Sequence, residues 1–179
     1  MAEMLRAVTE PTVIPSAHSG RAFLRAFVLY AGLAIALFYL FPSQRMFGWL
    51  LEWLAITVGG IASILGVDAL VSESLVVIPG EFGIDIAIEC SGVPELLLFL
   101  CAVLAFPTTP ASKLLGVTIA IVGVTTGNVL RLAALFLVGV RAPEYFDPVH
   151  TYVQGMLSYV LMAVLWIGWL KLSATRAKR

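Results

Sequence analysis

Three side chains whose types suit covalent chemistry lie in the second half of this 179-residue sequence. They are the thiol of Cys90, the guanidinium of Arg131 and the imidazole of His150. A thiolate is a strong nucleophile, a neighbouring cation lowers the pKa of its thiol, and a histidine can act as base and then as acid. An arginine can also stabilise a tetrahedral oxyanion. Together these residue types are the parts of a cysteine nucleophile site.

Each of the three also has an explanation that involves no chemistry. Cys90 could be a small buried hydrophobic residue, and His150 an interfacial residue at the start of a helix. Arg131 lies in an apolar run, about 14 Å from its end, and could form a structural pair with Glu95 or Asn128. Asn128 lies on the same helix face as Arg131. An arginine at that depth is costly, which favours a task or a buried partner.

The composition predicts that these residues belong to a membrane protein. Hydrophobic residues make up 60% of the chain, charged residues only 12%, and the mean hydropathy is +0.99. A soluble chain of this length could not bury so much apolar surface. The 11 basic residues balance the 11 acidic ones, and no basic tract with interleaved aromatic residues occurs. Nucleic-acid binding is therefore not indicated, and we expect an all-α integral membrane protein.

About five transmembrane helices are predicted, because five apolar runs approach the length of about 20 residues that a spanning helix needs. They comprise residues 22–41, 46–67, 91–106, 114–140 and 151–172. Residues 1–21 are predicted to form an N-terminal tail and residues 173–179 a basic C-terminal tail. Residues 22–172 then form a single membrane-embedded domain that holds the candidate residues.

Residues 70–89, between the second and third spans, are predicted to form an extramembrane β-hairpin. The run Leu75–Ile78 precedes a Pro79–Gly80 turn signal, and apolar and polar residues alternate from Phe82 to Glu89. The open edges of such a hairpin are not tolerated in lipid. Cys90 continues the apolar phase of the second strand, so its thiol is expected to face whatever that strand covers.

The order of the spans predicts that the three candidate residues meet at one face of the membrane. Span three begins on the hairpin side with Cys90, span four carries Arg131 in its last third near that side, and span five begins there after His150. This prediction requires only that spans three, four and five each cross the membrane once. The short loop between spans four and five keeps His150 near the exit of span four.

The same residues carry a wider resemblance. The sequence Glu-Cys-Ser-Gly-Val at residues 89–93 starts one span, Asn-Val-Leu-Arg at residues 128–131 lies within the next, and His150 with Gly155 starts the one after. Over residues 60–172 this set resembles the motifs of the exosortase/archaeosortase family, most closely the compact type called exosortase H. The proline and glutamate that follow the cysteine motif have no counterpart in that pattern.

The resemblance implies a membrane-embedded cysteine transpeptidase, a thiol protease of the cell inner membrane that acts in protein sorting. Such enzymes cleave a C-terminal sorting signal, made of a short motif, a transmembrane helix and a basic tail, from exported proteins and transfer them to an acceptor. Cys90 would be the nucleophile, Arg131 would stabilise developing charge, and His150 would be the general acid and base. The expected substrate-binding or supporting residues are Asn128, Ser91 and Glu95.

The resemblance also implies which partners the protein meets. They are the exported proteins and membrane lipid, and not nucleic acid, and neither a metal nor an organic cofactor is implied. Cys101, within the third span, is predicted to be a packing residue.

Two other kinds of protein are compatible with the sequence. A small transporter or channel subunit would use Arg131 as an anion site, and substitution of Cys90 would leave its function intact. A structural assembly protein would associate through glycine-rich faces of spans two and four, and substitution of Arg131 would change its oligomeric state.

A sorting enzyme must meet exported substrate, so the hairpin and the candidate residues are expected to face the extracytoplasmic side. Basic residues favour the cytoplasmic side. If spans one and two both cross, that side has Arg45, Lys113, Lys171, Arg176, Lys178 and Arg179. The candidate-site side then has Arg6, Arg21, Arg25 and Arg141. Either the N-terminal tail is exported despite its arginines, or spans one and two do not both cross.

Overall fold

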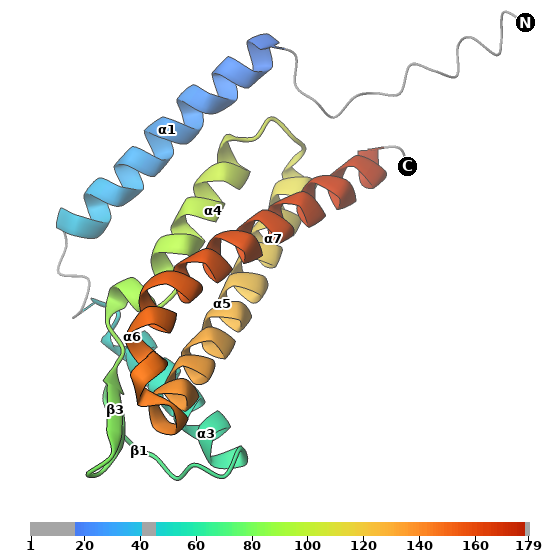
Figure 1. The fold of residues 1–179 in the computed structure, drawn as a ribbon. Helices are drawn as coiled ribbons and strands as arrows, with labels where there is room; N and C mark the ends of the chain where they lie inside the picture. Colours follow the sequence, from blue (N-terminus) through green and yellow to red (C-terminus); the bar gives the residue numbers. More distant parts are fainter. Residues whose placement is uncertain (1–16, 41–45, 178–179) are drawn as a thin grey trace, which may run out of the picture.

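The protein is mostly helical, with one small sheet (Figure 1). The computed structural model describes residues 17–40 and 46–177, with side chains over 20–40 and 46–174. The helices of more than one turn are α1 (Ala17–Leu40), α3 (Gly48–Ile64), α4 (Val93–Ala105), α5 (Pro110–Arg141) and α7 (Gln154–Ala177). Most of the predicted N-terminal tail, residues 1–16, and the last two residues of the basic tail lie outside the described residues.

Three stretches of described helix are long and apolar enough to cross a membrane, namely Gly20–Leu40, Pro110–Arg141 and Pro143–Ala174. The other two predicted spans are helical and apolar but shorter, because α3 has 17 residues and α4 has 13. The first ends before Gly66, whose positive φ of 79° turns the chain. The second ends before Pro107. The sequence thus identified five helices but overestimated the length of two.

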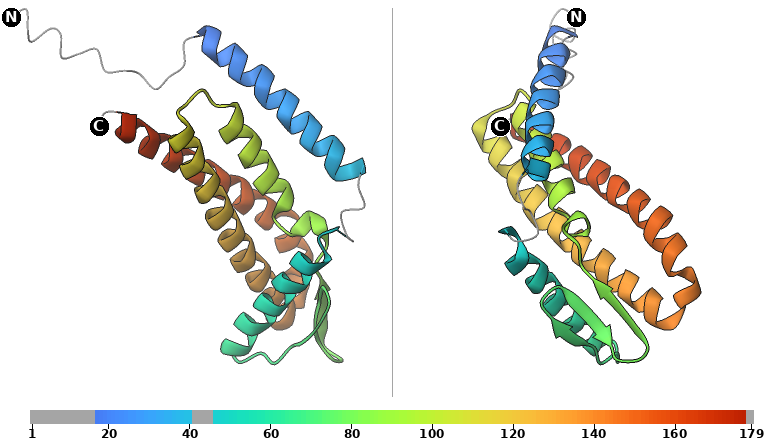
Figure 2. Two further views of the ribbon diagram at one scale, coloured as in Figure 1. Left: turned by 180° about the vertical axis from the view of Figure 1, so that it is seen from behind. Right: turned by 90° about the vertical axis from the view of Figure 1, so that its left-hand side faces the viewer.

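The helices α1, α4, α5 and α7 pack side by side in one bundle (Figure 2). In this bundle α1 and α5 run in one direction and α4 and α7 in the other. Outside it, α3 packs against the second half of α5. Arg141 Nη2 at the end of α5 donates a hydrogen bond of 3.4 Å to the carbonyl oxygen of Leu65 at the end of α3. The end of α3 therefore lies beside the end of α5, while α3 itself crosses the bundle obliquely (Figure 2).

The directions of the four bundle helices decide which of their ends lie together. The start of α1, the α4–α5 connection and the end of α7 lie at one end of the bundle (Figure 1). The sheet and residues 142–150 lie at the other end. At the first end are the basic residues Arg21, Arg25, Lys113 and Lys171, whereas Arg141 lies at the end with the sheet. Arg21 and Arg25 thus lie toward the opposite end of the bundle from the candidate site, which agrees with the alternative that spans one and two do not both cross.

Glycines let α5 and α7 approach closely. A Cβ atom at Gly116 would lie 2.8 Å from Nε1 of Trp169, and one at Gly123 would lie 2.7 Å from the side chain of Leu165. The Trp169 side chain is fully buried, and its Nε1 donates a hydrogen bond of 2.8 Å to the carbonyl oxygen of Ser112. Small residues of this kind bring helix backbones together where no hydrophobic effect can. The glycine-rich face of the fourth predicted span is thus covered by α7.

The sheet is antiparallel and has three strands, β1 (Leu70–Ser72), β2 (Leu75–Ile78) and β3 (Phe82–Asp85), in that order. The predicted hairpin is confirmed over β2 and β3, where Ile78 pairs with Phe82 across the Pro79–Gly80 turn. The strand β1 was not predicted. It forms because the chain turns at Glu73, which adopts a positive φ of 52°.

The second hairpin strand was predicted to reach residue 89, but β3 ends at Asp85. Its partner β2 begins at Leu75, so the following residues have no neighbouring strand, and the 3₁₀ helix η2 (Ile88–Cys90) takes their place. The side chains of Ile84, Ile86 and Ile88 are nevertheless all buried, as their alternation predicted. They join a core formed between the sheet, α3 and the second half of α5.

The contact between Gly139 of α5 and the ring of Phe82 on β3 attaches the sheet to the bundle. A Cβ atom at Gly139 would overlap this ring. We expect Gly139→Ala to lower the melting temperature of the detergent-solubilised protein, because overpacking costs about 1–3 kcal/mol and exceeds the helix-propensity gain of about 0.5–1 kcal/mol. The matched control is Gly168→Ala on α7, where a Cβ has no neighbour within 4 Å. A melting temperature equal to that of the control would contradict this contact.

Candidate active site

Cys90 lies in a tight turn that connects the sheet to α4. Ser91 Oγ donates a hydrogen bond of 2.6 Å to the carbonyl oxygen of Ile88 and accepts one of 3.2 Å from the Val93 main-chain N–H. Gly92 has a φ of 81°, and a Cβ there would lie 2.9 Å from the Asn128 side chain. The turn therefore needs glycine at this position. The hydroxyl of Ser91, expected to support the site, hydrogen-bonds within the turn that carries the thiol.

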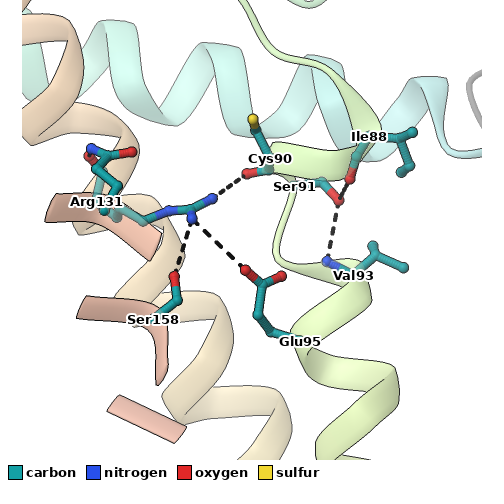
Figure 3. A network of polar contacts seen from close by, with 8 residues as sticks. Ile88, Cys90, Ser91, Val93, Glu95, Arg131 and Ser158 are labelled. Carbon is teal, nitrogen blue, oxygen red and sulfur yellow. Dashed lines mark hydrogen bonds and ion pairs between the residues drawn. The ribbon is translucent and has the colours of Figure 1, made fainter. Parts of the chain in front are cut away.

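The side chain of Arg131 joins this turn to three helices (Figure 3). Its Nη2 donates a hydrogen bond of 2.9 Å to the carbonyl oxygen of Cys90, and its Nη1 donates one of 3.1 Å to Ser158 Oγ on α7. The same Nη1 lies 3.7 Å from Oε1 of Glu95 on α4. The Arg131 side chain is 14% exposed and that of Glu95 is 21% exposed. The guanidinium is thus largely removed from solvent and is held by partners on α4, α7 and the cysteine turn.

Two of the polar residues around Arg131 were not identified from the sequence. They are Ser158, and Gln154, whose Nε2 donates a hydrogen bond of 3.0 Å to the main-chain oxygen of Arg131. Gln154 is buried. Both lie in an apolar run, one helical turn apart, and so share a helix face. That spacing of polar residues was the signal that could have identified them.

The thiol of Cys90 leaves the turn on a different side from its carbonyl group. In Figure 3 the sulfur points away from Glu95 and Ser158. The half-buried side chain packs against the core between α3, the sheet and α5. Burial raises the pKa of the Cys90 thiol, Arg131 lowers it, and the carboxylates of Glu89 and Glu95 raise it, so that the pKa lies above the ordinary value. The thiol is therefore protonated at neutral pH.

His150 lies outside this group of contacts. It belongs to the π-helical turn η4 (Val149–Val153), which follows the short elements η3 (Pro143–Tyr145) and α6 (Phe146–Pro148). The imidazole is exposed and stacks on the ring of Phe146, with 5.7 Å between the ring centroids. Within residues 17–40 and 46–177, no hydrogen bond or ion pair joins it to Cys90 or Arg131.

Of the predicted site residues, the structure thus brings five together. They are Cys90, Ser91, Glu95, Asn128 and Arg131. Among the described residues, no group of three or more His, Cys, Asp or Glu side chains could hold a metal ion. Cys101 is buried in α4, as expected of a packing residue.

A pocket of about 310 Å³ opens between α4, α5 and α7 beside the Arg131 side chain. Its polar residues are Glu95, Asn128, Arg131 and Ser158, and most of its other lining side chains are apolar. Neither Cys90 nor His150 is among the described residues that line it. The arrangement therefore consists of a half-buried thiol, a cation bound to the main chain of the thiol residue, and a separate pocket on the other side of that cation.

Most of the chain matches the model of a known protein family. The family model described as transmembrane exosortase matches residues 8–168, which includes all the predicted site residues. Comparison with curated proteins and with solved structures found no match. Because the family model covers most of the chain, the protein belongs to the transmembrane exosortase family.

Proposed function

We propose that this protein is a membrane-embedded cysteine transpeptidase or protease that cleaves the C-terminal sorting signal of exported proteins. The observation that carries the proposal is the hydrogen bond from the Arg131 guanidinium to the main chain of Cys90. It holds a buried cation beside the residue that bears the candidate nucleophile. Membership of the exosortase family supports the same chemistry.

The proposed reaction begins with attack of the Cys90 sulfur on the carbonyl carbon of an amide next to the C-terminal helix of the substrate. A sulfur–carbon bond forms, the carbon–nitrogen bond breaks, and the thiol proton passes through His150 to the leaving amine. Arg131 stabilises the oxyanion between these steps. An acceptor amine, or water, then attacks the thioester carbon; its bond to this carbon forms, the sulfur–carbon bond breaks, and its proton passes through His150 to the sulfur, which restores the thiol.

The raised pKa of the Cys90 thiol means that the reaction needs a general base to remove its proton. Because the pKa of Cys90 lies above the ordinary value, the sulfur must lose its proton when it attacks. In the proposal His150 is this general base, because it belongs to the set of motifs that resembles the exosortase family. The role requires the imidazole to leave its stack on Phe146, since the described contacts do not bring it to Cys90.

We propose that the sheet end of the bundle faces the extracytoplasmic side of the inner membrane. The described basic residues at the opposite end of the bundle support this orientation, because Arg21, Arg25, Lys113 and Lys171 all lie there. Between residues 46 and 92 and between 141 and 153, which form the sheet end and α3, the only described basic residue other than His150 is Arg141.

Two contacts disfavour the alternative functions. The guanidinium of Arg131 is held by Ser158, Glu95 and the Cys90 carbonyl oxygen, which argues against a site for a free, transported anion. The glycine-rich face of α5 is covered by α7 of the same chain, so it is not available for association with another molecule. No described contact favours either alternative over the transpeptidase.

The processing activity can be tested with matched cysteine variants. The protein is co-expressed with an exported protein that carries a C-terminal apolar helix and a basic tail, and cleavage is followed on a gel. We expect Cys90→Ala to abolish processing, because the nucleophile is lost, and Cys101→Ala to retain it, because Cys101 is a packing residue. Processing by Cys90→Ala at the wild-type rate would exclude the proposed function.

The charges around the thiol can be tested by alkylation with iodoacetamide in the Cys101→Ala background, followed by mass spectrometry. We expect the rate to rise with pH into the alkaline range, because the pKa of Cys90 is raised. Arg131→Gln removes a cation that lowers this pKa, so its pH profile should move to higher pH. Glu95→Gln removes a carboxylate that raises it, so the profile should move to lower pH. Shifts with the opposite signs would show that these groups do not act on the thiol.

The orientation can be tested by labelling single cysteines with a membrane-impermeant maleimide, in a Cys90→Ala, Cys101→Ala background. Glu81→Cys on the sheet side should be labelled in intact cells. Gly20→Cys and Ala111→Cys lie toward the opposite end and should be labelled only after permeabilisation. Labelling of Gly20→Cys in intact cells would instead support separate crossings by α1 and α3.

A further inference from the structure

Three residues that line the pocket between α4, α5 and α7 each have a buried polar atom without a hydrogen-bond partner. The atoms are Nδ2 of Asn128, Nε of Arg131 and Oε2 of Glu95. All three residues line the pocket, and Asn128 is only 5% exposed. Buried polar groups are almost always paired in folded proteins. Three such atoms on residues that line the same pocket therefore indicate a ligand that would pair with them.

The types of these atoms restrict the ligand. Asn128 and Arg131 offer N–H donors, whereas the Glu95 carboxylate is an acceptor. An anion would suit the guanidinium but would be repelled by Glu95, and a cation would suit Glu95 but would be repelled by Arg131. A neutral group with both an acceptor and a donor satisfies all three atoms. The peptide unit, with its C=O and its N–H, is such a group.

The walls of the pocket restrict the ligand further. Apart from its polar residues, the lining side chains are mostly apolar and include Leu130, Leu157, Leu161 and Met162. A protein segment with apolar side chains fits these walls. In a helix, however, the main-chain N–H and C=O groups are already bonded to each other. Only an unwound segment has main-chain groups free to pair with the three atoms.

We propose that this pocket binds an unwound, extended segment of the substrate next to its C-terminal helix. The Asn128 and Arg131 donors bind its carbonyl oxygens, and the Glu95 carboxylate accepts from one of its N–H groups. This proposal rests on the proposed function, in which the substrate is a protein with such a helix. Arg131 would then contact the substrate through Nε and the main chain of Cys90 through Nη2.

The conformation of the bound segment can be measured by disulfide cross-linking. The enzyme carries Cys90→Ala, Cys101→Ala and Leu157→Cys, where Leu157 is an exposed residue at the pocket. The probe is the co-expressed exported protein, with single cysteines at successive positions before its apolar helix. Met156→Cys is the matched control, because Met156 is also exposed on α7, at 68% against 56% for Leu157, but does not line the pocket.

We expect Leu157→Cys to form cross-links at alternating substrate positions, as in an extended chain, and Met156→Cys to form few. Cross-links at every third or fourth position would indicate a bound helix and would overturn the proposal. Cleavage of the probe by the wild-type protein without any cross-link to Leu157→Cys would overturn the pocket proposal alone. Absence of cleavage by the wild-type protein would instead overturn the proposed function.

The kinetics and the melting temperature of an Asn128 variant distinguish a role in substrate binding from a role in stability. Asn128→Leu replaces the amide with an apolar side chain of similar size. We expect it to raise KM about tenfold through loss of a hydrogen bond to substrate, with a smaller change in kcat. The melting temperature should not fall, because an unpaired buried donor is removed. A lower melting temperature with an unchanged KM would show that Asn128 has only a structural role.

Discussion

The burial of one guanidinium constrains the centre of this structure. Arg131 is largely removed from solvent, so its N–H groups need protein partners. They find them in the Cys90 carbonyl group, in Ser158 and in Glu95, which come from the cysteine turn, α7 and α4. Each of these elements must therefore keep its position relative to α5. The same cation that would stabilise negative charge during catalysis also fixes the turn that carries the candidate nucleophile.

The small sheet and α3 position Cys90 beside the Arg131 guanidinium. The buried side chains of Ile84, Ile86 and Ile88 hold the segment before the cysteine against α3 and α5, although the strand itself ends at Asp85. The turn at Gly92 then starts α4 in the opposite direction. Arg21 and Arg25 belong to the first half of α1, which begins at the far end of the bundle from the sheet.

Glu95 connects the thiol, the cation and the pocket. Its carboxylate pairs with Arg131, raises the pKa of the Cys90 thiol, and leaves one oxygen unpaired at the pocket.

The sequence by itself determined the five helices, the β2–β3 hairpin and the candidate residues, because apolar runs, alternation and motifs are local patterns. It could not give the lengths of α3 and α4, the strand β1 or the direction of α3, because these depend on turns at Glu73 and Gly66 and on packing against α5. Gln154 and Ser158 were missed because their roles exist only where α7 meets Arg131. The tertiary structure also decided that Arg131 binds the carbonyl oxygen of Cys90 and that His150 stacks on Phe146. Spacing along a chain predicts which residues share an element, whereas the direction in which a side chain points depends on what packs around it.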